Sequence, residues 1–287
     1  MLDRVTIESG RLKATVKVFG AELSSLFDKQ ENHEYIWTGD PEVWKGQAPW
    51  LFPFIGKLNG GAYKSGGKSY EMPSHGFAGK KEFVIESIKP DSVTFCLPAT
   101  SETLKIFPWR FRMWIKYQIT EENLTVSCAV TNEDSKDMYF SLGGHPGFIA
   151  EKGDALVFDA GEKLAVRRLK MPDHLLNEGV FGEYTSEIPI SGDLFKDDAM
   201  LFEAPASERC TLKRQNGKDI TLDYGKVTWL GVWSRAREDL RYVCVEPWFG
   251  VDDEVGFEGD VSEKKGIECL KPGEKKELRM TFIPHIY

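Results

Sequence analysis

The stretch FRMWIKYQITEENLTVSCAV, residues 111–130, decides the fold class of this chain. Apolar side chains occupy alternate positions in its first half, at Phe111, Met113, Ile115, Tyr117 and Ile119. The alternation returns after TEEN, at Leu124, Val126, Cys128 and Val130. A side-chain period of two is typical of a strand that is buried on one face. Two such runs joined by a short polar turn predict an antiparallel hairpin.

The same alternation recurs along the chain, whereas helical periodicity is nearly absent. It predicts further strands at Lys13–Val18, Glu82–Ile88, Ser92–Leu97, Lys218–Tyr224, Arg241–Glu246 and Glu277–Ile283. Short helical turns are expected only near Asp40–Trp44 and Lys196–Phe202. Many short strands separated by turn residues predict an all-β sandwich or barrel, without specifying the strand order.

The chain keeps one structural character from end to end, with no internal repeat and no low-complexity linker. The least periodic segment, residues 147–189, lies between strands of the same kind. We therefore predict that it is a long connection and not a domain boundary. All-β domains reach about 200 to 250 residues undivided. We expect residues 1–287 to form a single large antiparallel β-sandwich domain.

Composition limits the partners and the compartment. A formal net charge of −8 argues against a nucleic-acid surface, which needs clustered Lys and Arg. No apolar run reaches the roughly 18 residues of a membrane span, and the N-terminal residues alternate where a signal peptide would be apolar. The five cysteines are scattered, as in a reducing compartment. We expect a cytoplasmic protein, a monomer or homodimer, with no membrane partner.

Several common catalytic signatures are missing. The sequence contains no GxSxG elbow, no HExxH, no phosphate-binding loop and no GxGxxG. No two histidines lie within five residues of each other, so we expect no locally encoded metal site. A metal site assembled from distant strands stays open.

Glu246 is the most informative polar residue, in the stretch VCVEPWFG at 243–250. It follows an apolar strand, and we expect Pro247 to end that strand, which leaves the carboxylate at the end of a sheet or in a cleft. Partial burial would raise its pKa and suit it to general-base chemistry near neutral pH. The alternative is a solvated or salt-bridged glutamate at a strand end.

His145 lies in the stretch SLGGHPGF at 141–148. We expect Gly143 and Gly144 to permit positive φ and Pro146 to fix φ, so that the imidazole is aimed and not free to rotate. Histidine is the side chain best matched to proton transfer at the pH of a cell. A turn histidine bonded to a backbone carbonyl is an equally open interpretation.

Four further residues form a second group of candidates. They are His75 in PSHGFAG, Lys57 in FIGKLNGG, Asp198 in LFKDDAMLF and Trp233. Each has an ordinary alternative: a satisfied turn histidine, a solvated lysine, a helix cap and a core tryptophan. Taken together, aromatic faces beside carboxylates and imidazoles suit sugar rings, which are apolar on their faces and hydroxylated at their edges.

These stretches resemble the aldose 1-epimerase (galactose mutarotase-like) family, in particular its LacX-type branch. The matching stretches are, in chain order, LFPFIGKLNGGAY, YEMPSHGFAGKKEF, SLGGHPGF, DLFKDDAM, VCVEPWFG and KKGIECLKPGEKKEL. Among them, HGFAG, GGHPGF and EPW are the specific ones. The resemblance implies a β-supersandwich fold, an aldohexose substrate and no metal or organic cofactor.

The resemblance also implies roles for the candidates. Glu246 is expected to remove the proton from the C1 hydroxyl, and His145 to protonate the ring oxygen O5. His75 is expected to hold O5 or a neighbouring hydroxyl, and Asp198 to bind the sugar. We expect Glu246 and His145 to face each other across one cleft of about a pyranose's width.

Two departures from the family leave the substrate open. Lys57 stands where many mutarotases carry an arginine, and Gly79 where much of this branch carries another. One alternative is therefore a hexose-6-phosphate mutarotase, with an anion pocket built from Arg235, Arg237 and Arg241. The other is a sugar-binding or sensing protein that kept the pocket and lost turnover.

Overall fold

The predicted hairpin is present in the computed structural model, which describes residues 2–159 and 161–285. Strands β10 (Phe111–Ile119) and β11 (Leu124–Asn132) pair antiparallel from Phe111 opposite Asn132 to Ile119 opposite Leu124. Every second residue of both strands is buried, as the alternation of the sequence predicts.

This hairpin lies within an 11-stranded sheet. Its strands are, in spatial order, β16 (Lys163–Ala165), β19 (Glu183–Thr185), β20 (Glu187–Pro189), β15 (Ala155–Val157), β22 (Arg209–Lys213), β23 (Ile220–Asp223), β27 (Lys275–Pro284), β11, β10, β9 (Ser92–Pro98) and β8 (Val84–Lys89). A 4-stranded sheet holds β1 (Arg4–Glu8), β2 (Leu12–Lys17), β3 (Leu23–Asp28) and β4 (His33–Glu34).

A third sheet carries the residues of most interest. It contains β21 (Met200–Glu203), β24 (Trp229–Trp233), β25 (Tyr242–Phe249), β13 (Leu142–Gly144) and β5 (Trp50–Leu51), with β14 (Gly147–Ile149) also paired to β25. Three two-stranded ribbons are β6 (Ala62–Ser65) with β7 (Lys68–Glu71), β12 (Met138–Phe140) with β26 (Glu268–Leu270), and β17 (Leu169–Lys170) with β18 (Leu175–Leu176). The helical turns are α1 (Thr103–Ile106) and the 3-10 turns Asn59–Gly61, Ala78–Lys80, Gly192–Phe195 and Val261–Glu263.

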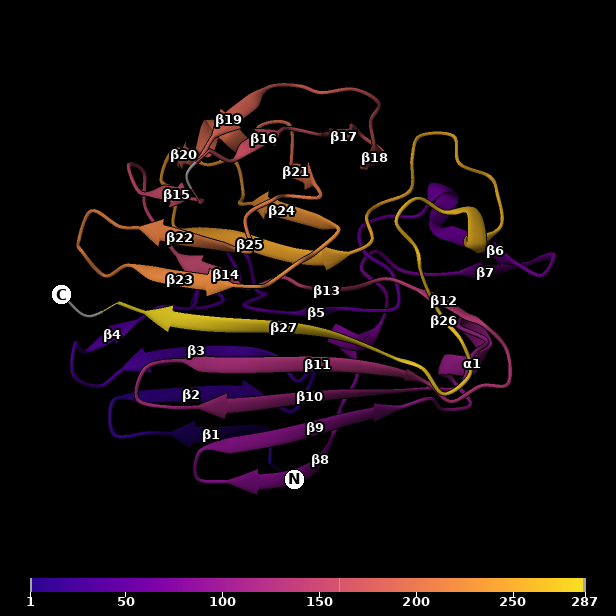
Figure 1. Cartoon of the computed structure of the whole chain (residues 1–287), viewed down its shortest axis with the longest axis horizontal. Helices are drawn as coiled ribbons and strands as arrows, with labels where there is room; N and C mark the ends of the chain where they lie inside the picture. The colour runs from indigo at the N-terminus through magenta and orange to yellow at the C-terminus, as the bar shows by residue number, and fades with distance from the viewer. Residues whose placement is uncertain (1, 160, 286–287) are drawn as a thin grey trace.

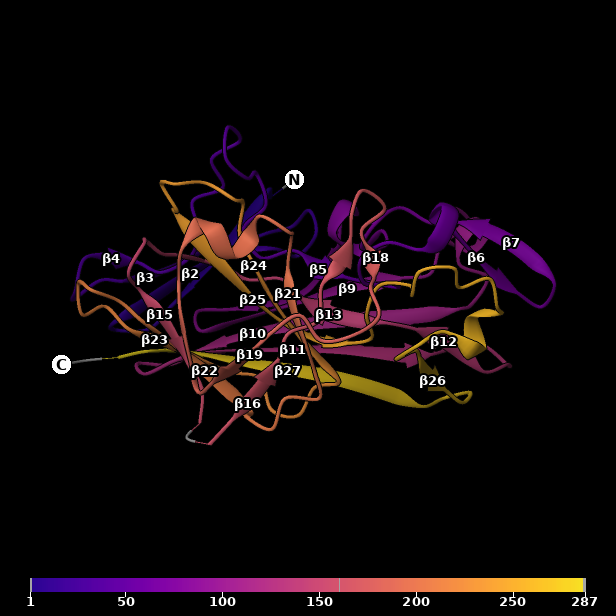
Figure 2. The ribbon, with the colours of Figure 1, turned by 90° about the horizontal axis from the view of Figure 1, so that it is seen from above.

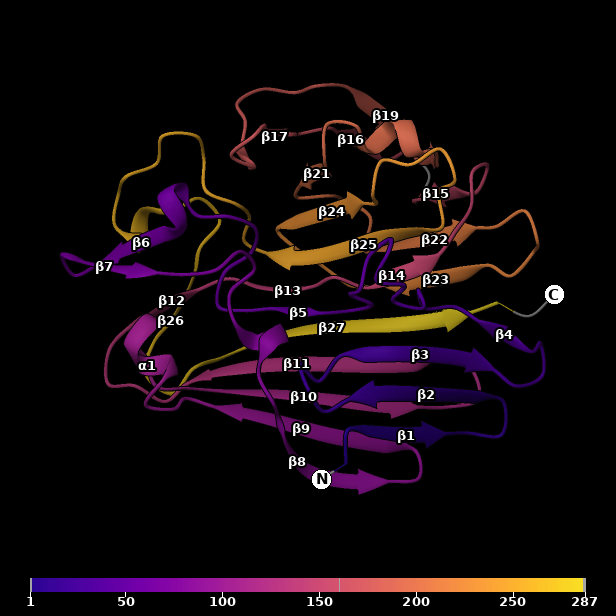
Figure 3. The ribbon, with the colours of Figure 1, turned by 180° about the vertical axis from the view of Figure 1, so that it is seen from behind.

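The sheets form two layers around a shared apolar core. Figures 1 and 3 show opposite faces of the molecule, with β27, β11, β10 and β9 in one layer and β1, β2, β3, β5 and β25 in the other. Figure 2 views the molecule from above, with β27 on one side and β2 and β3 on the other. Phe52, just after β5, is fully buried and contacts the rings of Phe77, Phe107, Phe111 and Phe140.

The predicted all-β sandwich is therefore correct, and each predicted strand has a counterpart with ends shifted by a few residues. Residues 147–189 are not a single long loop, because seven short strands, β14 to β20, lie within that segment. Residues 40–44 form turns without a helix, and Met200–Glu203 is a strand. Among the described residues, no helix is long and apolar enough to cross a membrane.

Strand β25 corrects the prediction that Pro247 ends the strand, because β25 continues to Phe249 with all eight residues buried. On one side of β25, β13 pairs with Phe249 and Trp248, and β14 pairs with Cys244 to Tyr242. Residues 245–247 of β25 lie between these two pairings. Pro247, which has no N–H to donate, therefore lies in the gap between the pairing with β13 and the pairing with β14, where the strand needs no hydrogen bond from it. Glu246 lies in the middle of a buried strand and not at its end.

Candidate active site

The interruption between β13 and β14 places His145 beside Glu246. The chain leaves β13 after Gly144 and rejoins β25 at Gly147, so His145 lies on the crossing segment opposite Glu246. Nε2 of His145 is 3.1 Å from Oε2 of Glu246, and the two residues are only 8% and 2% exposed. A buried carboxyl and a buried imidazole are thus in direct contact.

We had expected positive φ at the two glycines before His145, and this expectation was wrong. The structure shows that they matter through close packing instead. Neither has φ in the left-handed region. A Cβ on Gly143 would lie 2.4 Å from Cδ1 of Trp248, and one on Gly144 would lie 2.7 Å from Cε of Met280. The absence of side chains lets the crossing segment lie flat against its neighbours and carry the imidazole to β25.

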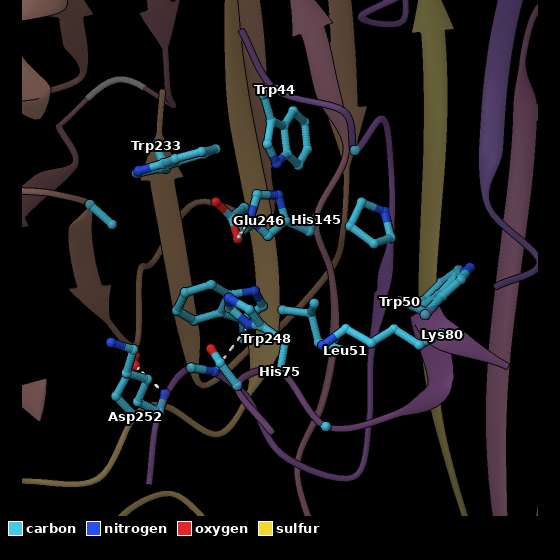
Figure 4. A pocket seen from close by; sticks show the side chains of 18 of the residues that line it. Trp44, Trp50, Leu51, His75, Lys80, His145, Trp233, Glu246, Trp248 and Asp252 are labelled. Atoms are coloured by element: carbon cyan, nitrogen blue, oxygen red, sulfur yellow. Dashed lines mark hydrogen bonds and ion pairs between the residues drawn. The ribbon is translucent and has the colours of Figure 1, made fainter. Parts of the chain in front are cut away.

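His145 and Glu246 form part of the wall of a cavity of about 860 Å³. All six residues predicted from the sequence line this cavity: Lys57, His75, His145, Asp198, Trp233 and Glu246. Figure 4 shows the His145–Glu246 pair near its centre, with Trp44 and Trp233 to one side and Trp248 and His75 to the other. The structure therefore brings together residues that lie up to 189 positions apart, from Lys57 to Glu246.

Aromatic rings surround the imidazole of the pair. Trp44 stacks on His145 with the ring centroids 5.1 Å apart, and Trp233 and His75 approach edge-on at 5.7 and 5.8 Å. Burial, with a smaller effect from the nearby His75, lowers the pKa of His145 to about 3. Burial also raises the pKa of Glu246 well above its usual value, with smaller effects from nearby carboxylates. Burial therefore favours the neutral forms of both members, a protonated carboxyl and a neutral imidazole, with one titrating proton on the pair.

His75 presents an N–H donor to the cavity. The backbone N–H of Gly56 donates to Nδ1 of His75 over 3.1 Å. Burial, followed by the charge of Lys80, lowers the pKa of His75 to about 4, so the ring is neutral and its proton lies on Nε2. The backbone of His75 has φ of +62°, a conformation that costs energy outside glycine.

Asp198 is held by a histidine that the sequence did not single out. Oδ2 of Asp198 contacts Nδ1 of His174, and Oδ1 accepts from the backbone N–H of Ala199 over 2.9 Å. Both Asp198 and His174 have positive φ, of +65° and +56°. Strained backbone of this kind clusters at functional sites. His174 lies between β17 and β18, within the segment expected to be a long connection.

Lys57 lines the cavity, and its backbone also holds a second carboxylate of the cavity wall in place. Its N–H donates to Oδ1 of Asp252 over 2.7 Å, and a Cβ on the preceding Gly56 would lie 1.7 Å from that oxygen. Asp252 also lines the cavity. Burial raises its pKa to about 6, although the hydrogen bond from the backbone of Lys57 acts to lower it.

Among the cavity residues that sequence reasoning missed are Trp44, Lys45, Lys80, His174 and Asp252. The local signals were weak. Trp44 belongs to a segment expected to be helical, and Lys80 directly follows Gly79, where we noted only the loss of a donor. Figure 4 shows the Lys80 side chain extending from the 3-10 turn Ala78–Lys80 toward Leu51. An ammonium group therefore enters the cavity close to the place of the missing arginine.

The three arginines considered as an anion pocket do not line the cavity. Arg237 donates two hydrogen bonds to Asp239, at 2.8 and 3.0 Å. Arg241 pairs with the same Asp239 and with Asp40. The charges of Arg237 and Arg241 are offset on the surface and are not available to a ligand in the cavity.

Within residues 2–159 and 161–285, one group of side chains has the spacing of a metal site: His145, Cys244 and Glu246. Their candidate ligand atoms all lie within 4.8 Å of one another, and all three residues are buried. Cys244 and Glu246 lie on β25, and His145 lies on the segment between β13 and β14, so the group joins distant parts of the chain.

The chain is similar to known proteins over almost its whole length. The chain is 28% identical over 278 residues to the chromosomal LacX protein of Lactococcus lactis subsp. lactis, covering 91% of this chain and 92% of that protein. A galactose mutarotase-like protein of Lactobacillus casei superposes with a TM-score of 0.91 at 33% identity, over 98% of this chain and 100% of that one. A galactose mutarotase related enzyme of Lactobacillus acidophilus superposes with a TM-score of 0.92 at 29% identity, over 99% of this chain and 97% of that one.

The fold is thus that of the galactose mutarotase-like proteins, as the resemblance of the sequence implies. The family model for aldose 1-epimerase matches residues 3–282, almost the whole chain. The chain belongs to the aldose 1-epimerase family.

Proposed function

We propose that this protein is an aldose 1-epimerase, an isomerase that interconverts the α and β anomers of a free aldohexose such as galactose or glucose. The observation that carries the proposal is the 3.1 Å contact between His145 and Glu246 in the wall of the cavity. Family membership supports the reaction class. The remaining polar lining, from His75 to Asp198, supports a hydroxylated substrate.

The contact changes how the two groups would act. We had expected them a pyranose's width apart, on opposite sides of the sugar. The hemiacetal oxygens O1 and O5, however, are bonded to the same carbon. Two groups that touch each other can therefore reach both oxygens from one side, with Glu246 at O1 and His145 at O5.

One proton on the pair is enough for the whole cycle. When it lies on His145, Nε2 donates it to O5 while Glu246 takes the proton of the C1 hydroxyl, and the C1–O5 bond breaks. The C1–C2 bond of the open aldehyde then rotates. Glu246 returns its proton to the carbonyl oxygen while His145 takes back the proton from O5, and the ring closes as the other anomer. Positioned proton transfer of this kind contributes about 10²–10⁴-fold in rate.

The other residues would hold the sugar during these transfers. The Nε2–H of His75 is a donor for O5 or a neighbouring hydroxyl, and Asp198 accepts from hydroxyls. Trp233 and Trp248 offer apolar faces for the C–H face of the ring.

Polarimetry tests the proposal directly. Freshly dissolved α-D-galactose or α-D-glucose should reach its equilibrium rotation faster with the wild-type protein than without it. Saturable binding of either hexose without acceleration would instead support a sugar-binding or sensing protein that has lost turnover.

One observation favours a second candidate, a hexose-6-phosphate mutarotase. The cavity is lined by Lys45, Lys57 and Lys80, and among the described residues their ammonium groups have no hydrogen-bond or ion-pair partner. Three such ammonium groups at one cavity can bind a phosphate, even though Glu22, Asp198, Glu246 and Asp252 line the same cavity.

The same assay with hexose 6-phosphates separates the two candidates. For the second, Lys80→Met should raise KM for the 6-phosphate and leave KM for the free hexose unchanged. Lys81→Met is the matched control, because Lys81 pairs with Glu102 and does not line the cavity. A wild-type preference for the free hexose would contradict the second candidate.

A further inference from the structure

Cys244 is a buried nucleophile for which the proton transfers have no use. It lies two residues before Glu246 on β25, so both side chains project from the same face of the strand. Cys244 is completely buried, and among the described residues its thiol has no hydrogen-bond partner. Its neighbours across the sheet are Trp233 on β24 and Gly147 on β14.

Three different ligand types therefore converge at the catalytic pair. The imidazole of His145, the thiol of Cys244 and the carboxyl of Glu246 offer one ligand atom each, all within 4.8 Å of one another. Around a tetrahedral zinc ion, ligand atoms lie about 3.5 Å apart. Small side-chain adjustments would bring the three atoms to that spacing. Nδ1 of His145 is buried without a hydrogen-bond partner, so the imidazole loses no hydrogen bond at that nitrogen when it adjusts.

We propose that His145, Cys244 and Glu246 bind one thiophilic divalent cation, such as Zn²⁺, and that the bound cation blocks the transfer of protons to the sugar. The ligand set favours this class of ion, because thiolate and imidazole select zinc-like cations over Mg²⁺ and Ca²⁺, which prefer oxygen ligands. Three protein ligands leave a fourth position that faces the cavity, where water completes the tetrahedron.

The charges of this complex balance. Binding forms one bond from the cation to each of the sulfur, nitrogen and oxygen atoms. It releases to water the thiol proton of Cys244 and the single proton that His145 and Glu246 share. A dication with one thiolate and one carboxylate has no net charge, so the buried site contains no uncompensated ion. With both catalytic groups held by the cation, neither can exchange protons with O1 or O5.

Binding of Cd²⁺ tests the site without reference to activity. Metal-free wild-type protein titrated with Cd²⁺ should develop the ultraviolet charge-transfer absorbance of a Cd²⁺–thiolate bond, saturating at one ion per chain. Cys244→Ala should lose this absorbance. Cys269→Ala is the matched control, because Cys269 is the exposed cysteine and its removal should leave the titration unchanged. Absorbance that persists in Cys244→Ala, or that fails to form in the wild type, overturns the proposal.

Two measurements cover the case in which Cys244→Ala does not fold. Cys244→Ser keeps the size of the side chain and should also lose the absorbance. An anomalous-difference map of wild-type crystals grown with Zn²⁺ should have a peak between the three side chains. A peak elsewhere, with none between these side chains, contradicts the site.

The inhibitory part of the inference rests on the proposed mutarotase function. Zn²⁺ should reduce wild-type mutarotation to the uncatalysed rate, and a chelator should restore it, whereas Mg²⁺ should have no effect. Cys244→Ser should retain activity and resist Zn²⁺. If the cation binds and the metal-free protein has no activity toward any hexose, the metal site stands and the proposed function fails. If Zn²⁺ inhibits Cys244→Ser as strongly as the wild type, the inhibitory inference fails and the function stands.

Discussion

At the scale of single residues, the candidate site depends on groups that are kept from water. His145 lies among Trp44, Trp233 and His75, and Glu246 lies in a fully buried strand. Burial disfavours the charged form of both groups, which is why one proton on the pair is the stable arrangement. The sequence suggested both residues, but it could not indicate their contact, because nothing local to either one encodes the other.

Asp252 predicts a dependence of stability on pH. Burial raises its pKa to about 6, above the usual value of 3.8, so the folded protein binds this proton more tightly than the unfolded chain. The resulting stabilisation is present below pH 4 and is lost as the pH rises through about 6. Asp252→Asn should therefore be more stable than the wild type at pH 8, by on the order of 2 to 3 kcal/mol, and similar to it at pH 4. Denaturant unfolding at both pH values measures this difference, and an equal effect at both would contradict it.

His174 predicts a separation of binding from turnover. It holds Asp198, which we expect to bind sugar hydroxyls in both ground and transition states. His174→Ala should raise KM about tenfold, the cost of losing a hydrogen bond to a charged group, with a smaller change in kcat. His174→Asn keeps a donor and should recover part of the loss. Initial rates over a range of sugar concentrations test this, and a fall in kcat at constant KM would contradict it.

At the scale of elements, the interruption between β13 and β14 is what creates the site. Two short strands pair with β25 on either side of the crossing segment, and His145 is the residue that this segment presents. Alternation of apolar residues predicted β25, because burial has a period of two in a strand. It could not predict the interruption, because the pairing joins segments about 100 residues apart.

In the segment that follows β5, replacing each of two glycines by alanine should reduce stability by a different amount. Gly56 and Gly60 have nearly the same φ, +63° and +65°, but a Cβ on Gly56 would meet Asp252 at 1.7 Å, whereas nothing lies within 4 Å of one on Gly60. Gly60→Ala should cost about 1 kcal/mol from backbone strain alone. Gly56→Ala should cost a further 1 to 3 kcal/mol, at roughly the level of overpacking in a core. Chemical denaturation of both variants tests this, and equal losses would contradict the packing argument.

At the scale of the whole molecule, the two layers of sheet provide the rigid support for the cavity. The hairpin at 111–130 and the other alternating segments were enough to predict this class of fold. The positions of Trp44, Lys80 and His174 were not predictable in the same way. Each lies outside the long alternating strands, and its place in the cavity depends on how distant parts of the chain pack.

The core between the layers predicts a large cost for one truncation. Phe52 is fully buried among four aromatic rings, so Phe52→Ala should reduce the free energy of unfolding by about 3 to 5 kcal/mol. Phe19→Ala is the matched control, because Phe19 is 56% exposed and its truncation should change stability by only about 0.5 kcal/mol. Urea unfolding of both variants measures the contrast, and a loss below about 1 kcal/mol for Phe52→Ala would contradict the packing that we describe.

The most direct test of the account is the initial rate of mutarotation, measured by polarimetry on fresh α-D-galactose and α-D-glucose. Relative to the wild type, Glu246→Gln and His145→Ala should each lower the rate at least about 100-fold while the proteins stay folded. Glu203→Gln is the control, since Glu203 pairs with Arg167 outside the cavity, and it should retain the wild-type rate. A Glu246→Gln protein that equilibrates either hexose as fast as the wild type would contradict the assignment of Glu246 and His145 as the catalytic pair.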